Sequence, residues 1–478
     1  MLFNSFNFAL FLPFVFILYW FVAYKSLKFQ NVLLLVSSYF FYSCWDWRFL
    51  FLLIFSTLLD YFSGIQIHKS NNEYQRKFWF WLSIFVNLGF LAVFKYFNFF
   101  MDSLKDLFSL FGFHMNIWSL KVILPIGISF YTFHGLSYVI DIYKRRINPE
   151  RNFIDYALFV SFFPLLVAGP IERATHLLPQ IKKKRTFNYN QAVDGLRQIL
   201  WGLFKKIVIA DNCAVYANMI FNSSTEYSGS TLVMGALFFT FQIYGDFSGY
   251  SDIALGASRL FGIELLQNFS FPYFSRDIAE FWRRWHISLS SWFKDYLYIP
   301  LGGSKGGKWM QIRNTFIIFL VSGFWHGANW TFIVWGFLNA IYFLPLLILN
   351  KNRNHIEIVA DQSNLPSIKE FLFMFTTFGL TVFAWIFFRA KNLHHAFQFI
   401  SEIFSKSFFS IPTVRPSYVI LLVLVFMIME WLGRKDRYAL EKMGFQYNSL
   451  LRWSMYTILL IAIFIFGNNE QEFIYFQF

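Results

Sequence analysis

Long stretches with almost no charged residue constrain this chain more than any other feature. Several approach the ~20 residues that cross a hydrocarbon core about 30 Å thick. Charged residues make up only 14% of the chain, against roughly 25% in an ordinary soluble domain. The sequence therefore predicts an all-α polytopic membrane protein, because helices are the practical spanning element for such runs. The stretches are 8–24, 49–66, 78–94, 119–140, 231–244, 330–349, 367–388, 417–433 and 452–467.

The net charge of +14 sets an orientation and does not indicate nucleic-acid binding. Lys and Arg cluster in short loops such as 144–151, 182–185 and 434–437, whereas the loops at 44–47, 222–230 and 468–472 are poor in them. Basic loops face the cytoplasm and attract anionic lipid headgroups. The alternation predicts about eleven or twelve crossings of a bacterial cytoplasmic membrane, with membrane lipid as a partner and the N-terminus outside.

Two segments interrupt this pattern. Residues 154–180 lie between two basic loops and contain two prolines and a glycine near their middle, which predicts a re-entrant segment. Residues 245–312 are rich in Gly, Ser, Arg and aromatics, and should lie at the interface or fold into the bundle. We expect one membrane domain over 1–478, with a catalytic core at about 119–349 and peripheral helices at 1–118 and 350–478.

His326 is the strongest catalytic candidate. It lies in VSGFWHGANW, where two apolar runs meet at Ser322, Gly323, Gly327 and Ala328. Small residues let helix backbones approach closely and can open a cavity at membrane depth. A neutral imidazole there can accept a proton from a hydroxyl, as a general base must. The structural alternative is a buried histidine that is hydrogen-bonded to a carbonyl.

Other chemistries have weaker support. Ser322 precedes His326 by four residues, but no neighbouring carboxylate completes a triad, and such a serine often bonds back to its own helix. His286 and His326 lack any HxxxH or HExxH spacing, so we expect no metal. The loop 302–308 (GGSKGGK) resembles a phosphate loop, but Trp309 replaces the required Ser or Thr and no strand precedes it.

The remaining polar chemistry lies at 245–300. GDFSGYSD contains Asp246 and Asp252, which could hold a cation, cap a helix or order the site, with capping and ordering favoured. FWRRWHISLSSW contains Arg283, Arg284 and Trp285. These residues suit an interfacial anchor, and they also suit the approach of an anionic, nucleotide-bearing donor.

At these residues the chain resembles the membrane-bound O-acyltransferase family, in particular its alginate O-acetyltransferase branch, and more distantly the D-alanyl transferase of teichoic acid. The resemblance runs along the whole chain, and YIPLGG favours the alginate-type branch. Its blocks are MLFNSFNFALFLPFVFILYW, LPIGISFYTFHGLSYVIDIY, FFPLLVAGPIER, the stretch from QIYGDFSGYSD to WRRWHISLSSWFKDYLYIPLGG, and SGFWHGANW.

The resemblance implies that His326 is the catalytic histidine and that His286 is a second characteristic histidine facing the cytoplasmic access. It further implies an acyl thioester such as acetyl-CoA as co-substrate, with no tightly bound cofactor. An extracytoplasmic polysaccharide would be the acceptor, and Asn329 with nearby backbone N–H groups could stabilise the oxyanion. Because the chain has no GDS motif, we expect a separate extracytoplasmic SGNH-type transferase as partner.

Two classes of function therefore remain open. The first is O-acyl transfer, with acetyl to a polysaccharide favoured over D-alanyl to teichoic acid. The second is transport of a polysaccharide or acyl group, because many helices and buried polar groups also suit conduction.

Overall fold

The computed structural model describes residues 1–113, 120, 123–467 and 471–474. All regular structure among these residues is helical, which confirms the predicted fold class. The apolar run predicted at 119–140 and the loop predicted at 468–472 fall partly outside the described residues.

The chain forms two compact units. Unit 1 comprises Met1–Tyr189 and Ser258–Leu265, and unit 2 comprises Asn190–Ala257 and Leu266–Phe478. The division passes through the predicted core at about 119–349, whose extent stays a prediction.

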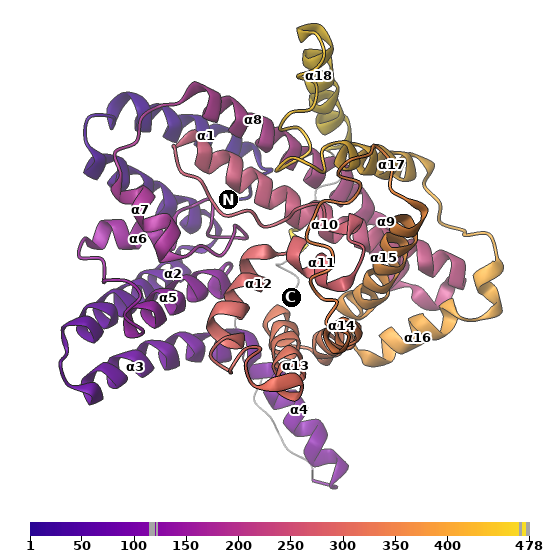
Figure 1. Ribbon diagram of the computed structural model, residues 1–478, viewed down its shortest axis with the longest axis horizontal. Coiled ribbons are helices and arrows are strands. Elements are labelled where there is room, and N and C mark those ends of the chain that lie inside the picture. The colour runs from indigo at the N-terminus through magenta and orange to yellow at the C-terminus, as the bar shows by residue number, and fades with distance from the viewer. Residues whose placement is uncertain (114–119, 121–122, 468–470, 475–478) are drawn as a thin grey trace. The chain divides into compact units, whose positions relative to one another are not determined.

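In unit 1, the helices α2, α3 and α5 pack against one another and lie side by side in Figure 1. Asp46 has an extended backbone inside α2 (φ −155°, ψ 110°), so α2 is two helices that meet at a kink. The kink lies in the predicted loop at 44–47. The helices of this unit are α1 Phe6–Ile17, α2 Leu27–Lys69, α3 Glu73–Leu91, α4 Phe97–Leu110, α5 Ile128–Tyr143, α6 Phe153–Ser161 and α7 Ala174–Lys182, with π-helical turns at Leu18–Val22 and Ala92–Tyr96.

The segment predicted to be re-entrant consists of two short helices. Each of α6 and α7 has nine residues, too few to cross a bilayer. The irregular residues 162–173 between them are buried, and the backbone N–H of Glu172 donates to Nε2 of His134 at 3.1 Å. This is the buried environment that irregular backbone requires at membrane depth.

Unit 2 contains the remaining helices. Residues 245–260 belong to the long helix α10, so only the later part of the predicted irregular segment is irregular. The helices are α8 Tyr189–Leu203, α9 Asp211–Asn222, α10 Gly229–Leu260, α11 Ile278–Arg284, α12 Ile287–Phe293, α13 Gly307–His326, α14 Trp330–Ile348, α15 Ile368–Arg389, α16 Leu393–Ile403, α17 Ser417–Leu432 and α18 Ser449–Phe466. Shorter 3₁₀ or π-helical turns lie at Phe204–Ala210, Ser224–Glu226, Pro272–Phe274, Lys294–Tyr298 and Lys406–Phe409.

Hydrogen bonds between helix ends define two ends of unit 2. At the basic end, Lys308 at the start of α13 donates to the carbonyl of Ile348 at the end of α14 (2.9 Å), and Arg434 after α17 donates to that of Val359 (3.1 Å). At the opposite end, Nδ2 of Asn329 before α14 donates to the carbonyl of Lys391 after α15 (2.9 Å). His326, the last residue of α13, lies toward this opposite end.

Within the part of the chain that the structure describes, five helical segments are long and apolar enough to cross a membrane, and two more apolar helices, Phe6–Val22 and Ser417–Leu432, are shorter. This agrees with a polytopic membrane protein. The number of crossings, predicted as eleven or twelve, stays a prediction because kinks and π-helical turns join neighbouring runs into one element. The five are Leu27–Lys69, Glu73–Leu110, Trp330–Ile348, Ile368–Arg389 and Ser449–Phe466.

Candidate active site

His326 lies where α13 and α14 pack unusually closely. A Cβ atom on Gly323 would lie 2.2 Å from the carbonyl oxygen of Phe332, and one on Gly336 would lie 2.3 Å from that of Phe319. Only glycine permits such contact between the two backbones. The small residues beside His326 therefore serve close helix packing, and the imidazole at this junction is 4% exposed.

Aromatic rings surround the imidazole of His326. Its centroid lies 4.9 Å from Trp325, 5.1 Å from Trp335 and 5.2 Å from Phe388. The centroid of His286 lies 6.4 Å away. The structure thus brings together the two histidines that the resemblance singled out, although 40 residues separate them in sequence.

His286 is fixed in place by its backbone and by one amide. It precedes α12 with a left-handed backbone (φ 44°), an uncommon conformation for a residue other than glycine. Its Nδ1 lies 3.0 Å from Oδ1 of Asn268, which also accepts from the Ser288 hydroxyl (2.9 Å). Because an amide oxygen only accepts, Nδ1 carries the hydrogen. His286 lies outside the candidate spanning helices, and burial lowers its pKa to about 3, so it is neutral at pH 7.

A cavity of about 510 Å³ extends from the basic end of unit 2 toward His326. Its inner wall includes Ser322, one helical turn before His326, together with Trp282 and Phe319. Trp335 contacts both Trp282 in the cavity wall and His326, with ring centroids 5.7 Å and 5.1 Å away. The outer part of the wall is polar and basic, with Lys294, Ser304, Gln311, Asn350, Asn352 and Arg353.

The two arginines predicted to meet a donor lie in polar contacts near the basic end. Arg283 is exposed and donates to the carbonyls of Asn352 (2.8 Å) and His355 (2.6 Å). Arg284 forms an ion pair with Glu280 (2.9 Å). Their part in donor binding stays a prediction.

Trp285 and Asn329 have structural contacts that sequence patterns did not reveal. Trp285 is 2% exposed and packs against Tyr273 and Trp385, so it belongs to the aromatic core, which is at odds with an interfacial anchor. Asn329 caps α14, with Oδ1 accepting from the Thr331 N–H (3.0 Å) while Nδ2 donates to Lys391. A contribution to the oxyanion site stays a prediction, and it would have to use the second amide hydrogen.

Asp246 holds the C-terminal part of the chain. It is 2% exposed, forms an ion pair with Lys206 (2.8 Å), and accepts from the N–H of Ile474 (2.6 Å). Phe473 packs against Tyr250 with centroids 4.6 Å apart. A role of Asp246 in ordering the site stays a prediction, and the segment it contacts here lies 228 residues away, which local sequence does not indicate.

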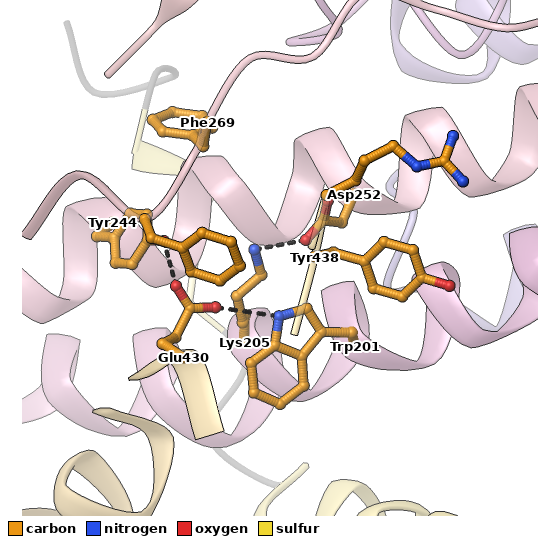
Figure 2. Close-up of a pocket in the computed structure, with 9 residues that line it drawn as sticks. Trp201, Lys205, Tyr244, Asp252, Phe269, Glu430 and Tyr438 are labelled. Carbon is orange, nitrogen blue, oxygen red and sulfur yellow. Dashed lines mark hydrogen bonds and ion pairs between the residues drawn. The ribbon is translucent and has the colours of Figure 1, made fainter. Parts of the chain in front are cut away.

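Asp252 belongs to a second buried network, shown in Figure 2. It forms an ion pair with Lys205 (2.6 Å) and accepts from the Gln198 amide (2.8 Å). Glu430 of α17 accepts from the Tyr244 hydroxyl (2.5 Å) and the Trp201 indole (3.2 Å) beside it. Sequence analysis missed Lys205 and Glu430, although a lone acidic residue in an apolar run is itself a signal.

Among the described residues, no group of three or more His, Cys, Asp or Glu side chains could hold a metal ion. His326 offers a buried imidazole, next to a cavity that reaches within a helical turn of it.

Comparison with known proteins agrees with this description. A sequence model of MBOAT, the membrane-bound O-acyltransferase family, matches residues 144–387. A protein of Pseudomonas putida named probable alginate O-acetylase AlgI is 36% identical over 98% of this chain and 98% of its own length. A peptidoglycan O-acetyltransferase of Helicobacter pylori is 38% identical over 83% of this chain and 79% of its own.

A more distant relative is the teichoic acid D-alanyltransferase of Bacillus subtilis, which is 28% identical over 56% of this chain and 70% of its own length. The near full-length similarity lies with the O-acetylating proteins. The chain therefore belongs to the membrane-bound O-acyltransferase family and is an O-acyltransferase of its alginate O-acetyltransferase-like branch.

Proposed function

We propose that this enzyme moves an acetyl group from a cytoplasmic thioester donor to hydroxyls of an extracytoplasmic polysaccharide, with His326 as general base. The observation that carries the proposal is the cavity that reaches Ser322 from the basic end of unit 2, with His326 a helical turn beyond. The names of the relatives, an alginate O-acetylase and a peptidoglycan O-acetyltransferase, support a glycan acceptor.

The donor's chemistry suits this cavity. A thioester such as acetyl-CoA combines anionic phosphates with a slender chain. Lys294 and Arg353 in the outer wall attract phosphate, while Phe319 and Trp282 line the inner part. The reacting carbonyl would then approach Ser322, and a shift of Trp335 would admit it to His326. Arg283 and Arg284 add positive charge on the same side.

The reaction uses His326 as a proton carrier. Its imidazole takes the proton of the acceptor hydroxyl as the oxygen attacks the thioester carbonyl. The C–S bond breaks, and the thiolate leaves with the proton that His326 returns. The ring centroid of His286 lies 6.4 Å away, and its Nδ1 hydrogen faces Asn268, so this hydrogen is not directed at the reacting groups. The acceptor is either the glycan or a separate SGNH-type transferase that passes the group on.

The orientation is part of the proposal. Basic loops at 434–437 and 351–353 lie at one end of unit 2, which supports a cytoplasmic position for that end and a position of His326 in the outer half of a bacterial cytoplasmic membrane. The alternation of basic and non-basic loops along the sequence supports an N-terminus outside.

Substitution of His326 tests the proposal. We expect His326→Ala and His326→Gln to lower acetyl transfer by about 10²- to 10⁴-fold, the usual contribution of a general base, with polymer still reaching the cell surface. Mass spectrometry of the surface polymer measures its amount and its acetylation, and it distinguishes acetyl from D-alanyl groups. The control is His68→Ala, an exposed histidine in unit 1. Unchanged acetylation in both His326 variants would contradict catalysis, and loss of exported polymer would favour transport.

A further inference from the structure

Aromatic rings meet at the inner end of the cavity that reaches Ser322, which we call the donor cavity. Trp282 of α11 and Phe319 of α13 both lie in its wall, with ring centroids 5.4 Å apart. Trp335 of α14 is 1% exposed and contacts both Trp282 (5.7 Å) and His326 (5.1 Å). Rings at these separations touch one another. Trp282 therefore links the wall of the donor cavity to the packed rings around the histidine.

The helices at this end of the cavity are already packed backbone to backbone. A Cβ atom on Gly336 of α14 would lie 2.3 Å from the carbonyl oxygen of Phe319 in α13. Trp335 in addition stacks on Trp385 of α15, with centroids 5.6 Å apart. A close-packed interior of this kind does not yield easily to extra methylene groups. Additional space can therefore come only from a side chain that lines the cavity, and Trp282 is the largest of these.

A buried amide holds the indole of Trp282 in place. Nε1 of Trp282 donates to Oδ1 of Asn339 (3.3 Å), and Nδ2 of Asn339 donates to the carbonyl of Trp335 (2.8 Å). Asn339 is 3% exposed and is the only amide side chain in the apolar helix α14. Polar side chains inside apolar helices commonly make such bonds to a neighbouring helix. Asn339 thus ties Trp282 of α11 to α14.

This arrangement limits the size of an acyl group at the inner end. With the thioester carbonyl near Ser322, an acetyl group adds a single methyl beyond that carbonyl. A longer acyl group adds methylenes, which would have to lie against the ring of Trp282 or displace it. Apolar methylenes favour binding only where the site has room for them.

We propose that Trp282 is the specificity-determining residue that restricts the donor to a short acyl group, with Asn339 as its positioning residue. The inference rests on the proposed donor cavity and adds the selection of acyl length. A smaller side chain at position 282 opens the inner end, and the enzyme then accepts longer acyl groups.

Equilibrium binding of acetyl-CoA and butyryl-CoA to the full-length protein in detergent tests this inference without turnover. We expect wild type to bind acetyl-CoA at least about tenfold more tightly than butyryl-CoA, because the longer chain overpacks the inner end. Trp282→Ala should bind butyryl-CoA at least as tightly as acetyl-CoA, because two more methylenes are then buried. The ratio of the two affinities does not depend on the fraction of folded protein.

Two further variants separate position from bulk. Asn339→Leu should reduce the preference for acetyl-CoA by about threefold, the effect of losing one hydrogen bond that holds the ring. Trp309→Ala is the matched control, since Trp309 is 84% exposed and lies outside the cavity wall, and it should keep the wild-type preference.

The possible results distinguish this inference from the proposed function. The same affinity ratio in wild type and Trp282→Ala, or a wild type that does not discriminate, would overturn the inference alone. If neither thioester binds any of the proteins, the proposed donor cavity is wrong and the inference falls with it. A failure of the general-base role is separable, because His326→Gln should keep the binding preference whatever its effect on acetylation.

Discussion

At the scale of single residues, the site depends on groups that hold the histidines in position. Asn268 fixes the tautomer of His286, and a left-handed backbone at His286 directs its ring toward Trp325 and His326. Conformations of this kind cost free energy and persist where the surroundings enforce them. These contacts fix the ring of His286 in place, and its catalytic part stays a prediction.

The protonation of His286 predicts how stability depends on pH. Its folded pKa is about 3, below the ~6.5 of an exposed imidazole. Between these values the unfolded chain binds a proton that the folded chain does not, so the free energy of unfolding rises with pH. Lowering the pH from 6.5 toward 5 should cost about 1.4 kcal/mol per unit from this residue.

Thermal unfolding in detergent between about pH 5 and pH 7 measures this dependence. His286→Asn should flatten it, because asparagine tolerates positive φ and has no proton to gain. The other histidines contribute equally to the pH dependence of stability in both proteins, so their contributions cancel in the difference. Equal slopes in wild type and variant would contradict the buried, neutral state of His286.

At the scale of helices, glycines decide how closely α13 and α14 approach. Gly323 and Gly336 face the partner backbone, whereas a Cβ atom on Gly379 in α15 would meet nothing within 4 Å. Sequence indicates close packing at Gly323, which lies among the small residues beside His326, but it does not distinguish Gly336 from Gly379, because both lie within long apolar runs.

The matched pair Gly323→Ala and Gly379→Ala tests this difference. Gly323→Ala must push α13 and α14 apart and should destabilise the protein by about 1–3 kcal/mol, as overpacking does, with a loss of acyl transfer because His326 ends α13. Gly379→Ala should leave activity unchanged and raise stability by up to about 1 kcal/mol through helix propensity. Thermal unfolding and acetylation assays measure both, and similar effects of the two changes would refute the packing argument.

At the scale of the whole molecule, buried ion pairs tie distant segments of unit 2 together. Lys206 contacts Asp211 (2.7 Å) and Asp246 (2.8 Å), and it also donates to the carbonyl of Gln471 (3.0 Å). Through these contacts residues 471–474 are held against α10. A buried charge that loses its partner is costly.

Lys206→Met should therefore destabilise the protein by about 3–5 kcal/mol, because it leaves two buried carboxylates without their cation. The triple change Lys206→Met, Asp211→Asn and Asp246→Asn should recover most of that loss. Thermal unfolding measures stability, and carboxypeptidase digestion reports whether residues 471–474 are released. If Lys206→Met is as stable as wild type, the ion-pair network contributes little to stability.

Much of this description follows from sequence. The apolar runs predict an all-α membrane protein, and the small residues around His326 indicate a packed junction, because these are local patterns with direct physical causes. The break at 44–47 and the buried irregular turn at 162–173 also agree with expectation. The burial of Trp285 could not be predicted, since a Trp–Arg cluster looks the same at an interface and in an aromatic core, and its part in a donor path stays a prediction.

By itself, the sequence determined the fold class, the basic and non-basic loops and the candidate histidine His326, because hydropathy, charge and a long family resemblance are properties of the chain. Only the tertiary structure decided three further features: Asn268 behind His286, the cavity that ends at Ser322, and the contacts of Asp246 with Lys206 and Ile474. Each of these joins segments that are far apart in sequence, and such contacts arise from packing, which leaves no local pattern.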